Sequence, residues 1–114
     1  MTIMLDELEF RDRSDEAMGR LQKSLEAASD RYDFEVDRSQ GALAIEFDDP
    51  PAKFVVSPNS PVRQIWVSAR VKSFKLDWDP ARAEFVLGGD GRSLRELIAG
   101  VVGEQLGEDI TLAA

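Results

Sequence analysis

Apolar residues recur at helical spacing in the first part of the chain, from about Asp6 to Ser29. Acidic residues such as Glu9, Asp12 and Glu16 fall on the opposite side of the same helical projection. The pattern predicts an amphipathic helix over residues 6–29 that packs through one face and presents negative charge on the other. The predicted apolar arc consists of Phe10, Ala17, Met18, Leu21, Leu25 and Ala28.

From residue 33 onward the spacing of apolar residues changes from helical to about two. Leu43, Ile45 and Phe47 alternate with Ala44 and Glu46, which is typical of a strand with one buried face. Turn residues recur every several positions, so the strands are expected to form an antiparallel meander. The predicted strands are residues 33–37, 42–48, 53–57, 62–69, 71–78 and 83–87, with turns at 48–51, 57–61 and 79–80.

A second helix is predicted after the glycine-rich segment at residues 88–91. Ser93 and Glu96 have the spacing of a capping box at its start. Gly103 and Gly107 are expected to end it, and the short apolar tail at residues 110–112 is expected to pack between the two helices. The predicted buried stripe of this helix is Leu94, Leu97, Ile98, Val101 and Val102.

The predicted order of helix, six strands and helix indicates an α+β fold. We expect a two-layer α/β sandwich in which two helices pack on one face of a six-stranded antiparallel sheet. The length of 114 residues fits a single domain, residues 1–114, with one core. The second face of the sheet is then expected to be open.

Two tryptophans are assigned to opposite faces of this predicted sheet. If Ile65 points toward the helices, strict alternation turns Gln64 and Trp66 outward onto the open face. An exposed tryptophan among polar neighbours has the composition of a protein-binding hot spot. Trp78 shares a face with Phe74 and is expected to lie in the core.

The charge is unevenly distributed along the chain. Residues 1–49 hold fourteen acidic and six basic residues, whereas residues 50–114 hold eight of each, so the net charge of −8 arises in the first part. An acidic chain is poorly suited to nucleic acid, because binding to phosphates is driven by Lys and Arg contacts. The charge suits cations or a basic protein surface instead.

The chain contains no cysteine and no histidine. This excludes thiolate metal sites, cysteine nucleophiles and the commonest general base, so an enzyme has the least support. A bound metal would need oxygen ligands, which favours hard cations such as ferric iron. The first ten residues hold acidic and no basic side chains, and no apolar run is long enough to span a membrane, so we expect a cytoplasmic protein.

Several segments match family motifs in order. The main one is Asn59-Ser60-Pro61-Val62-Arg63-Gln64-Ile65-Trp66-Val67-Ser68. Shorter ones are Leu8-Glu9-Phe10, Gly41-Ala42-Leu43-Ala44-Ile45, Asp77-Trp78, Asp90-Gly91-Arg92-Ser93-Leu94-Arg95-Glu96-Leu97 and Gly107-Glu108-Asp109-Ile110-Thr111-Leu112. Together they resemble the motifs of the frataxin family, over nearly the whole chain. The chain is similar to the bacterial members of that family.

The resemblance implies an iron-binding regulator of iron-sulfur cluster assembly, with weakly held ferric or ferrous iron as its cofactor. The implied partners are cysteine desulfurase and the cluster scaffold protein. The implied metal-binding residues are Glu9, Asp12, Asp15, Glu16, Glu26, Asp30, Asp33, Glu35 and Asp37. The implied partner-binding residues are Trp66, Gln64, Asn59, Ser60 and Arg63.

The acidic ridge departs from the pattern of many family members. Gln22, Lys23, Ala27 and Ala28 stand where those members carry a dense run of acids late in the first helix. The alternative interpretation of the remaining acids is a solvated helix face. Exposed carboxylates on separate turns predict weak, salt-sensitive iron binding at several places.

Three functions therefore remain open at this point. The first is a monomeric regulatory protein that binds no nucleic acid and no membrane. The second is an iron carrier or store that oligomerises with ferric iron. The third, with the least support, is a ferroxidase.

Overall fold

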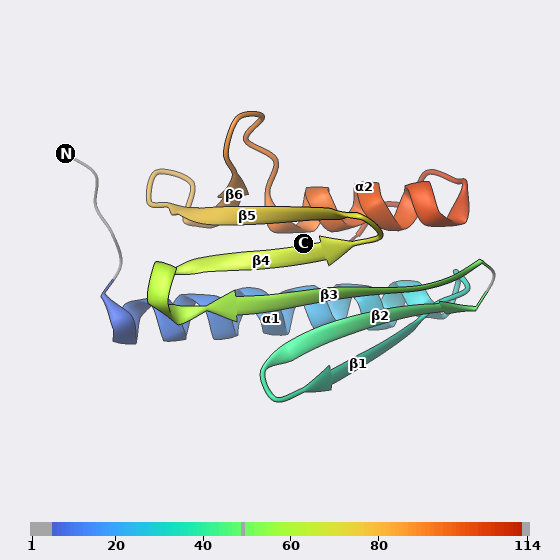
Figure 1. Cartoon of the computed structure of the whole chain (residues 1–114), viewed down its shortest axis with the longest axis horizontal. Helices are drawn as coiled ribbons and strands as arrows, with labels where there is room; N and C mark the ends of the chain where they lie inside the picture. The colour runs from blue at the N-terminus through green and yellow to red at the C-terminus, as the bar shows by residue number, and fades with distance from the viewer. Residues whose placement is uncertain (1–5, 49, 113–114) are drawn as a thin grey trace.

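The structure is a computed structural model that describes residues 6–48 and 50–112. Two helices flank a run of six strands (Figure 1). In chain order the elements are α1 (Glu7–Ser29), β1 (Glu35–Ser39), β2 (Ala42–Asp48), β3 (Pro51–Asn59), a 3-10 turn η1 (Ser60–Val62), β4 (Gln64–Ala69), β5 (Lys72–Asp79), β6 (Glu84–Leu87) and α2 (Leu94–Leu106). No helix within these described ranges is both long and apolar enough to cross a membrane.

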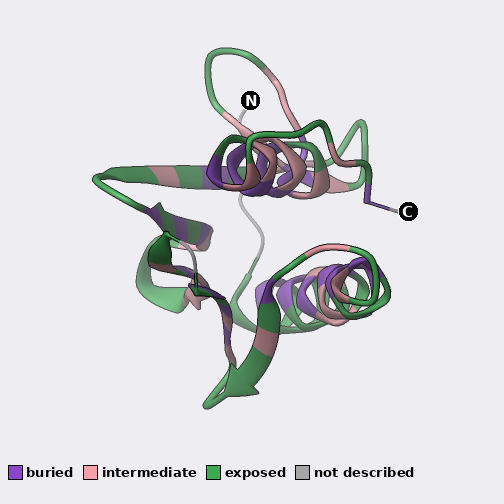
Figure 2. Cartoon of the chain, turned by 90° about the vertical axis from the view of Figure 1, so that its right-hand side faces the viewer, coloured by how far each residue is buried: buried purple, intermediate pink, exposed green. Residues whose placement is uncertain are grey.

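The six strands form one antiparallel sheet in the order β1-β2-β3-β4-β5-β6. Both helices lie on the same face of this sheet and run roughly along the strands (Figures 1 and 2). The predicted two-layer α+β architecture is confirmed. Because every strand pairs with its neighbour in sequence, side-chain alternation alone decides which residues face the helices.

The core lies between the sheet and the helices, and Figure 2 marks the buried segments of both layers in purple. Phe10 of α1 meets Phe85 of β6 edge to face, with ring centroids 5.9 Å apart. The predicted apolar positions of both helices are buried, apart from the half-buried Ala17. Hydrophobic burial of this layer is the main source of stability in such a fold.

Both helices begin at side-chain caps. The carboxylate of Asp6 accepts a hydrogen bond of 2.8 Å from the backbone N–H of Glu9. Ser93 and Glu96 form the predicted capping box, in which each side chain accepts from the other residue's backbone N–H. These bonds satisfy N–H groups that have no partner within the helix.

The end of α2 differs in part from the prediction. Gly107 caps the helix in the left-handed conformation with φ 71°, as a C-terminal glycine commonly does. Gly103, however, lies inside α2. A Cβ at Gly103 would come within 2.8 Å of the backbone oxygen of Glu108. Gly103 therefore allows the returning chain to approach closely, and Leu112 of the predicted tail is 2% exposed in the core.

The predicted turn at residues 57–61 is wrong in its position. β3 continues through Ser57 and Pro58 to Asn59, and Pro58 lies opposite Ile65 of β4. The pairing of β3 with β2 extends only to Val56, so the missing N–H of Pro58 falls where β3 has one neighbour and costs no bond on the other side.

The chain reverses instead through η1 and Arg63, which adopts the left-handed conformation with φ 52°. The strand predicted over residues 62–69 therefore begins at Gln64, and Val62 lies in the exposed turn. The 3-10 turn forms here because Pro61 presets its backbone and cannot continue a ladder. Of the other strands, β2 has the predicted bounds, and β1, β5 and β6 differ from theirs by one or two residues at an end.

Trp78 is only partly in the core, contrary to the prediction. Its ring packs against Phe85 with centroids 5.1 Å apart, and the guanidinium of Arg13 lies 5.4 Å from its centroid. β5 is followed by only one further strand, β6. The indole therefore sits near the border of the core, where an arginine of α1 partly covers it.

Candidate functional site

Trp66 stands on the sheet face that the helices leave open. Its neighbours in β4, Ile65 and Val67, are buried toward the helices, whereas the indole is 37% exposed. The prediction that alternation turns Trp66 outward is confirmed. Within the described residues the large exposed hydrophobic side chains are Leu8, Val62, Trp66 and Val71. Of these, only Trp66 is on a strand.

Cross-strand pairing surrounds Trp66 with polar residues. Ser57 of β3 and Lys75 of β5 lie directly opposite Trp66. One pair further along the sheet, Gln64 lies between Asn59 and Asp77. Opposite residues on one face have Cβ atoms about 5 Å apart, so these side chains can interact directly.

Two contacts hold the indole, and a third holds its hydrogen-bond partner Gln64. The indole N–H of Trp66 donates to Oε1 of Gln64 at 3.0 Å. The amide nitrogen of Gln64 in turn donates to Oδ1 of Asp77 at 3.0 Å. The ammonium of Lys75 lies 5.0 Å from the centroid of a Trp66 ring, within the range of a cation–π interaction. We refer to Gln64, Trp66, Lys75 and Asp77 as the open-face array.

The remaining predicted partner-binding residues lie at the end of this array. Asn59 is half-buried opposite Gln64, and Ser60 is exposed at the start of η1. Arg63 is half-buried, and its Nε has no hydrogen-bond partner in the structure. The fold thus brings these five predicted residues onto the open face and its adjoining turn.

Lys75 and Asp77 were not among the predicted partner-binding residues. The sequence does carry a signal for them: a two-residue turn, Arg70 and Val71, joins β4 to β5 with Ala69 opposite Lys72. Counting back from that turn places Lys75 opposite Trp66. Register is set by turn length in a hairpin, so the pairing follows once the turn is located.

The nine predicted metal-binding residues are all exposed but are spread over the molecule. They occupy α1, the segment that follows it, and β1. Glu16 pairs with Arg20 at 2.8 Å, with both side chains largely in solvent. Within residues 6–48 and 50–112 no group of three acidic side chains could hold a metal ion together. A cation on this surface would therefore keep most of its water.

Comparison with known proteins agrees with this architecture. A family model for the frataxin-like domain matches residues 3–108. The iron-sulfur cluster assembly protein CyaY of Azotobacter vinelandii is 34% identical over 100 residues, covering 86% of this chain and 90% of the relative. CyaY of Dechloromonas aromatica is 34% identical over 108 residues, covering 95% and 99%.

A solved structure shares the fold at low sequence identity. The frataxin of Psychromonas ingrahamii superposes with a TM-score of 0.82 at 15% identity, covering 96% of this chain and all of that one. The motifs, the sheet order and the match of the family model over most of the sequence lead to one conclusion: the chain belongs to the frataxin-like family.

Proposed function

We propose that this protein takes part in iron-sulfur cluster assembly as a regulator that docks on cysteine desulfurase and its scaffold protein. Relatives that match most of the chain are named iron-sulfur cluster assembly proteins. The observation that carries the docking proposal is Trp66, an indole held on an open sheet face by Gln64 and Lys75. The proposal places the protein in the cytoplasm and gives it no catalytic step of its own.

The open-face array suits a protein partner on physical grounds. Trp is among the residues that most often dominate binding energy, and an indole already held in place loses little conformational freedom on binding. Lys75 and Asp77 offer one charge of each sign beside the ring. Their hydrogen bonds and charges can fix the orientation of a partner while the indole supplies buried area.

Comparing two truncations tests the docking proposal. We expect Trp66→Ala to weaken binding of purified cysteine desulfurase by about 2 kcal/mol, roughly thirtyfold in Kd. Val71→Ala is the matched control, because Val71 is 99% exposed and lies in the hairpin turn. Unchanged Kd for Trp66→Ala would refute docking through this face. A thermal midpoint lowered far beyond the few degrees typical of a surface substitution would show instead that the ring is structural.

The acidic residues of α1 and β1 support weak iron binding in this proposal. Because no three of the described acids form a common site, iron would be held by one or two carboxylates and water. Exposed charges are screened over about 8 Å at physiological ionic strength, so binding should weaken as salt is raised. A single stoichiometric site of nanomolar affinity in physiological salt would contradict this account.

Two measurements separate regulation from the alternatives. Growth of particle mass in light scattering on addition of ferric iron would favour storage. Dioxygen consumption with repeated turnover of ferrous iron would favour a ferroxidase. We expect neither at protein concentrations where Trp66-dependent binding of the desulfurase is saturated.

A further inference from the structure

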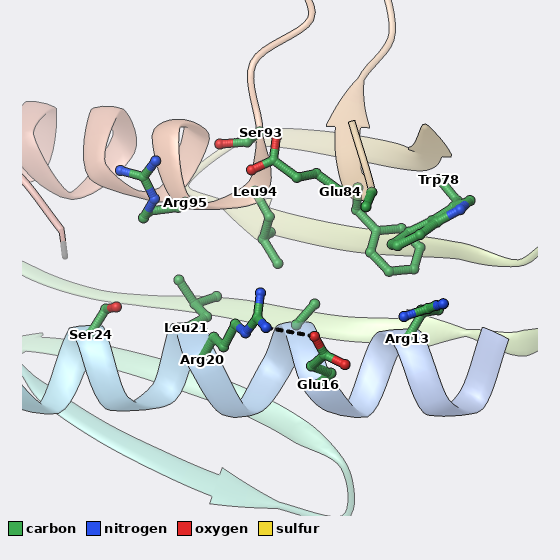
Figure 3. Close-up of a pocket in the computed structure, with 13 residues that line it drawn as sticks. Arg13, Glu16, Arg20, Leu21, Ser24, Trp78, Glu84, Ser93, Leu94 and Arg95 are labelled. Carbon is green, nitrogen blue, oxygen red and sulfur yellow. Dashed lines mark ion pairs between the residues drawn. The ribbon is translucent and has the colours of Figure 1, made fainter. Parts of the chain in front are cut away.

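A groove of about 310 Å³ runs between α1 and α2 on the side of the molecule opposite the open-face array (Figure 3). Its apolar lining includes Leu21 of α1, Leu94 of α2 and Phe85 of β6, all of which belong to the core. The half-buried Trp78 closes one end. Its volume is at the small end of the range for ligand pockets.

Three arginines surround this apolar floor although the protein carries a net charge of −8. Arg13 lies beside Trp78, Arg20 rises from α1 toward α2, and Arg95 projects from α2 (Figure 3). Helical spacing explains the first two: they are seven residues apart and therefore lie on the same side of α1. Of the acids on α1, Glu9, Asp12 and Asp15 do not line the groove, whereas Glu16 does.

The acidic residues that do line the groove already have partners. Glu16 pairs with Arg20 at 2.8 Å, and Glu84 pairs with Arg82 at 3.0 Å. Among the described residues, Arg13 and Arg95 form no ion pair with a carboxylate. Arg95 donates to the backbone oxygen of Leu112 at 3.2 Å, a bond that leaves its other N–H groups available.

We propose that this groove binds a small organic anion, a carboxylate carried on a flat apolar body. A guanidinium binds a carboxylate through two parallel hydrogen bonds, and Arg13 and Arg95 supply the unpaired guanidinium groups. Leu21, Leu94 and Trp78 line the groove and offer apolar contact to the body of the ligand. This inference is independent of the docking proposal, because the groove and the open-face array lie on opposite sides of the sheet.

Naphthoate and its neutral amide, naphthamide, form a matched pair of probes for the groove. The chain has two tryptophans, and their indole N–H resonances report on the two faces separately. In a titration of the ¹⁵N-labelled full chain, we expect naphthoate to shift the Trp78 indole resonance with a Kd of about a millimolar or tighter, and to leave Trp66 in place. Naphthamide should bind about tenfold more weakly, because it lacks the charge.

Arginine variants test whether the unpaired guanidinium groups carry the binding. We expect Arg13→Gln/Arg95→Gln to weaken naphthoate about tenfold or more and to leave naphthamide unchanged. Arg11→Gln is the control, since Arg11 is exposed on the same helix but does not line the groove. Arg95→Lys keeps the charge without the paired N–H groups and should weaken binding by less than Arg95→Gln does.

Several outcomes would overturn the proposal. Equal affinities for naphthoate and naphthamide would show that the arginines of the groove do not select an anion. So would a loss of naphthoate affinity in Arg11→Gln as large as that in Arg13→Gln/Arg95→Gln. Parallel shifts of Trp66 and Trp78 would show that binding is not confined to the groove. If a polyglutamate peptide shifted the Trp78 resonance and naphthoate did not, the ligand of the groove would be an acidic protein segment and not a small anion.

Discussion

Gly103 and Gly19 form a natural pair for testing how closely the carboxyl-terminal tail packs. Both lie inside helices, where replacing Gly by Ala ordinarily stabilises by up to about 1 kcal/mol. A Cβ at Gly19 would meet nothing within 4 Å. A Cβ at Gly103 would come within 2.8 Å of the Glu108 backbone oxygen, a distance at which the backbone has to move.

The two substitutions should therefore have opposite signs. Overpacking typically costs about 1–3 kcal/mol, so against the helix gain we expect Gly103→Ala to lower the free energy of unfolding by about 1–2 kcal/mol. Gly19→Ala should raise it by about 0.5–1 kcal/mol. Urea unfolding followed by circular dichroism measures both, with slopes unchanged if the unfolded states are alike.

The tail itself provides a second readout of the same perturbation. The backbone N–H groups of Gly107 and Glu108 both donate to the Gly103 carbonyl, and Leu112 follows in the core. Moving Glu108 away from a new methyl group should loosen this segment. We expect faster hydrogen exchange at Gly107 and Glu108 in Gly103→Ala and no change there in Gly19→Ala. Stabilisation by both alanines would refute the close approach.

Three further predictions concern the array, the α2 cap and the core. Gln64→Ala should lower the free energy of unfolding by under about 1 kcal/mol, because the hydrogen bonds of Gln64 are exposed. The same substitution should broaden the Trp66 indole resonance and weaken desulfurase binding severalfold in titration. Hydrogen bonds from the backbone N–H and then the side chain of Ser93 lower the pKa of Glu96 below its ordinary 4.5. This stabilisation is present above about pH 4.5 and is lost as pH falls through the lowered pKa. The wild-type protein should therefore melt at a higher temperature than Glu96→Gln near pH 7, and this difference should shrink in acid. A difference that stays constant from pH 7 to pH 3 would contradict stabilisation by the charged Glu96 carboxylate. Leu97→Ala, at 0% exposure, should cost about 2–5 kcal/mol in urea unfolding.

Alternation and helical spacing predicted the layers of this fold well, because burial on one face of each element follows directly from its period. Leu43, Ile45 and Phe47 are buried as predicted, and both helices bury the expected stripes. The turn before β4 lies later than predicted, because Pro58, a typical turn residue, belongs to β3. The position of this turn depends on where β2 stops pairing with β3. The residues of β3 alone do not reveal that point.

The residues of the candidate site that lie on one strand were predicted, whereas those that depend on pairing between strands were not. Trp66 and Gln64 are on one strand, two residues apart, so the period of a strand was enough to place both on the open face. Lys75 and Asp77 join them only through pairing with β5. The metal-binding residues remain a prediction: α1 and β1 lie against each other, but no three of the described acids form a common site.

The alternation that exposes Trp66 also explains why this small protein presents two chemically different surfaces. Successive side chains of β4 point alternately toward the helices and toward the open face. The sheet therefore separates the open-face array from the groove between the helices. Each face has one tryptophan: Trp66 beside Lys75, and Trp78 beneath Arg13. A partner on the array and an anion in the groove would not touch one another. Coupling between them would have to pass through the packed core, which the two indole resonances would report when both ligands are present.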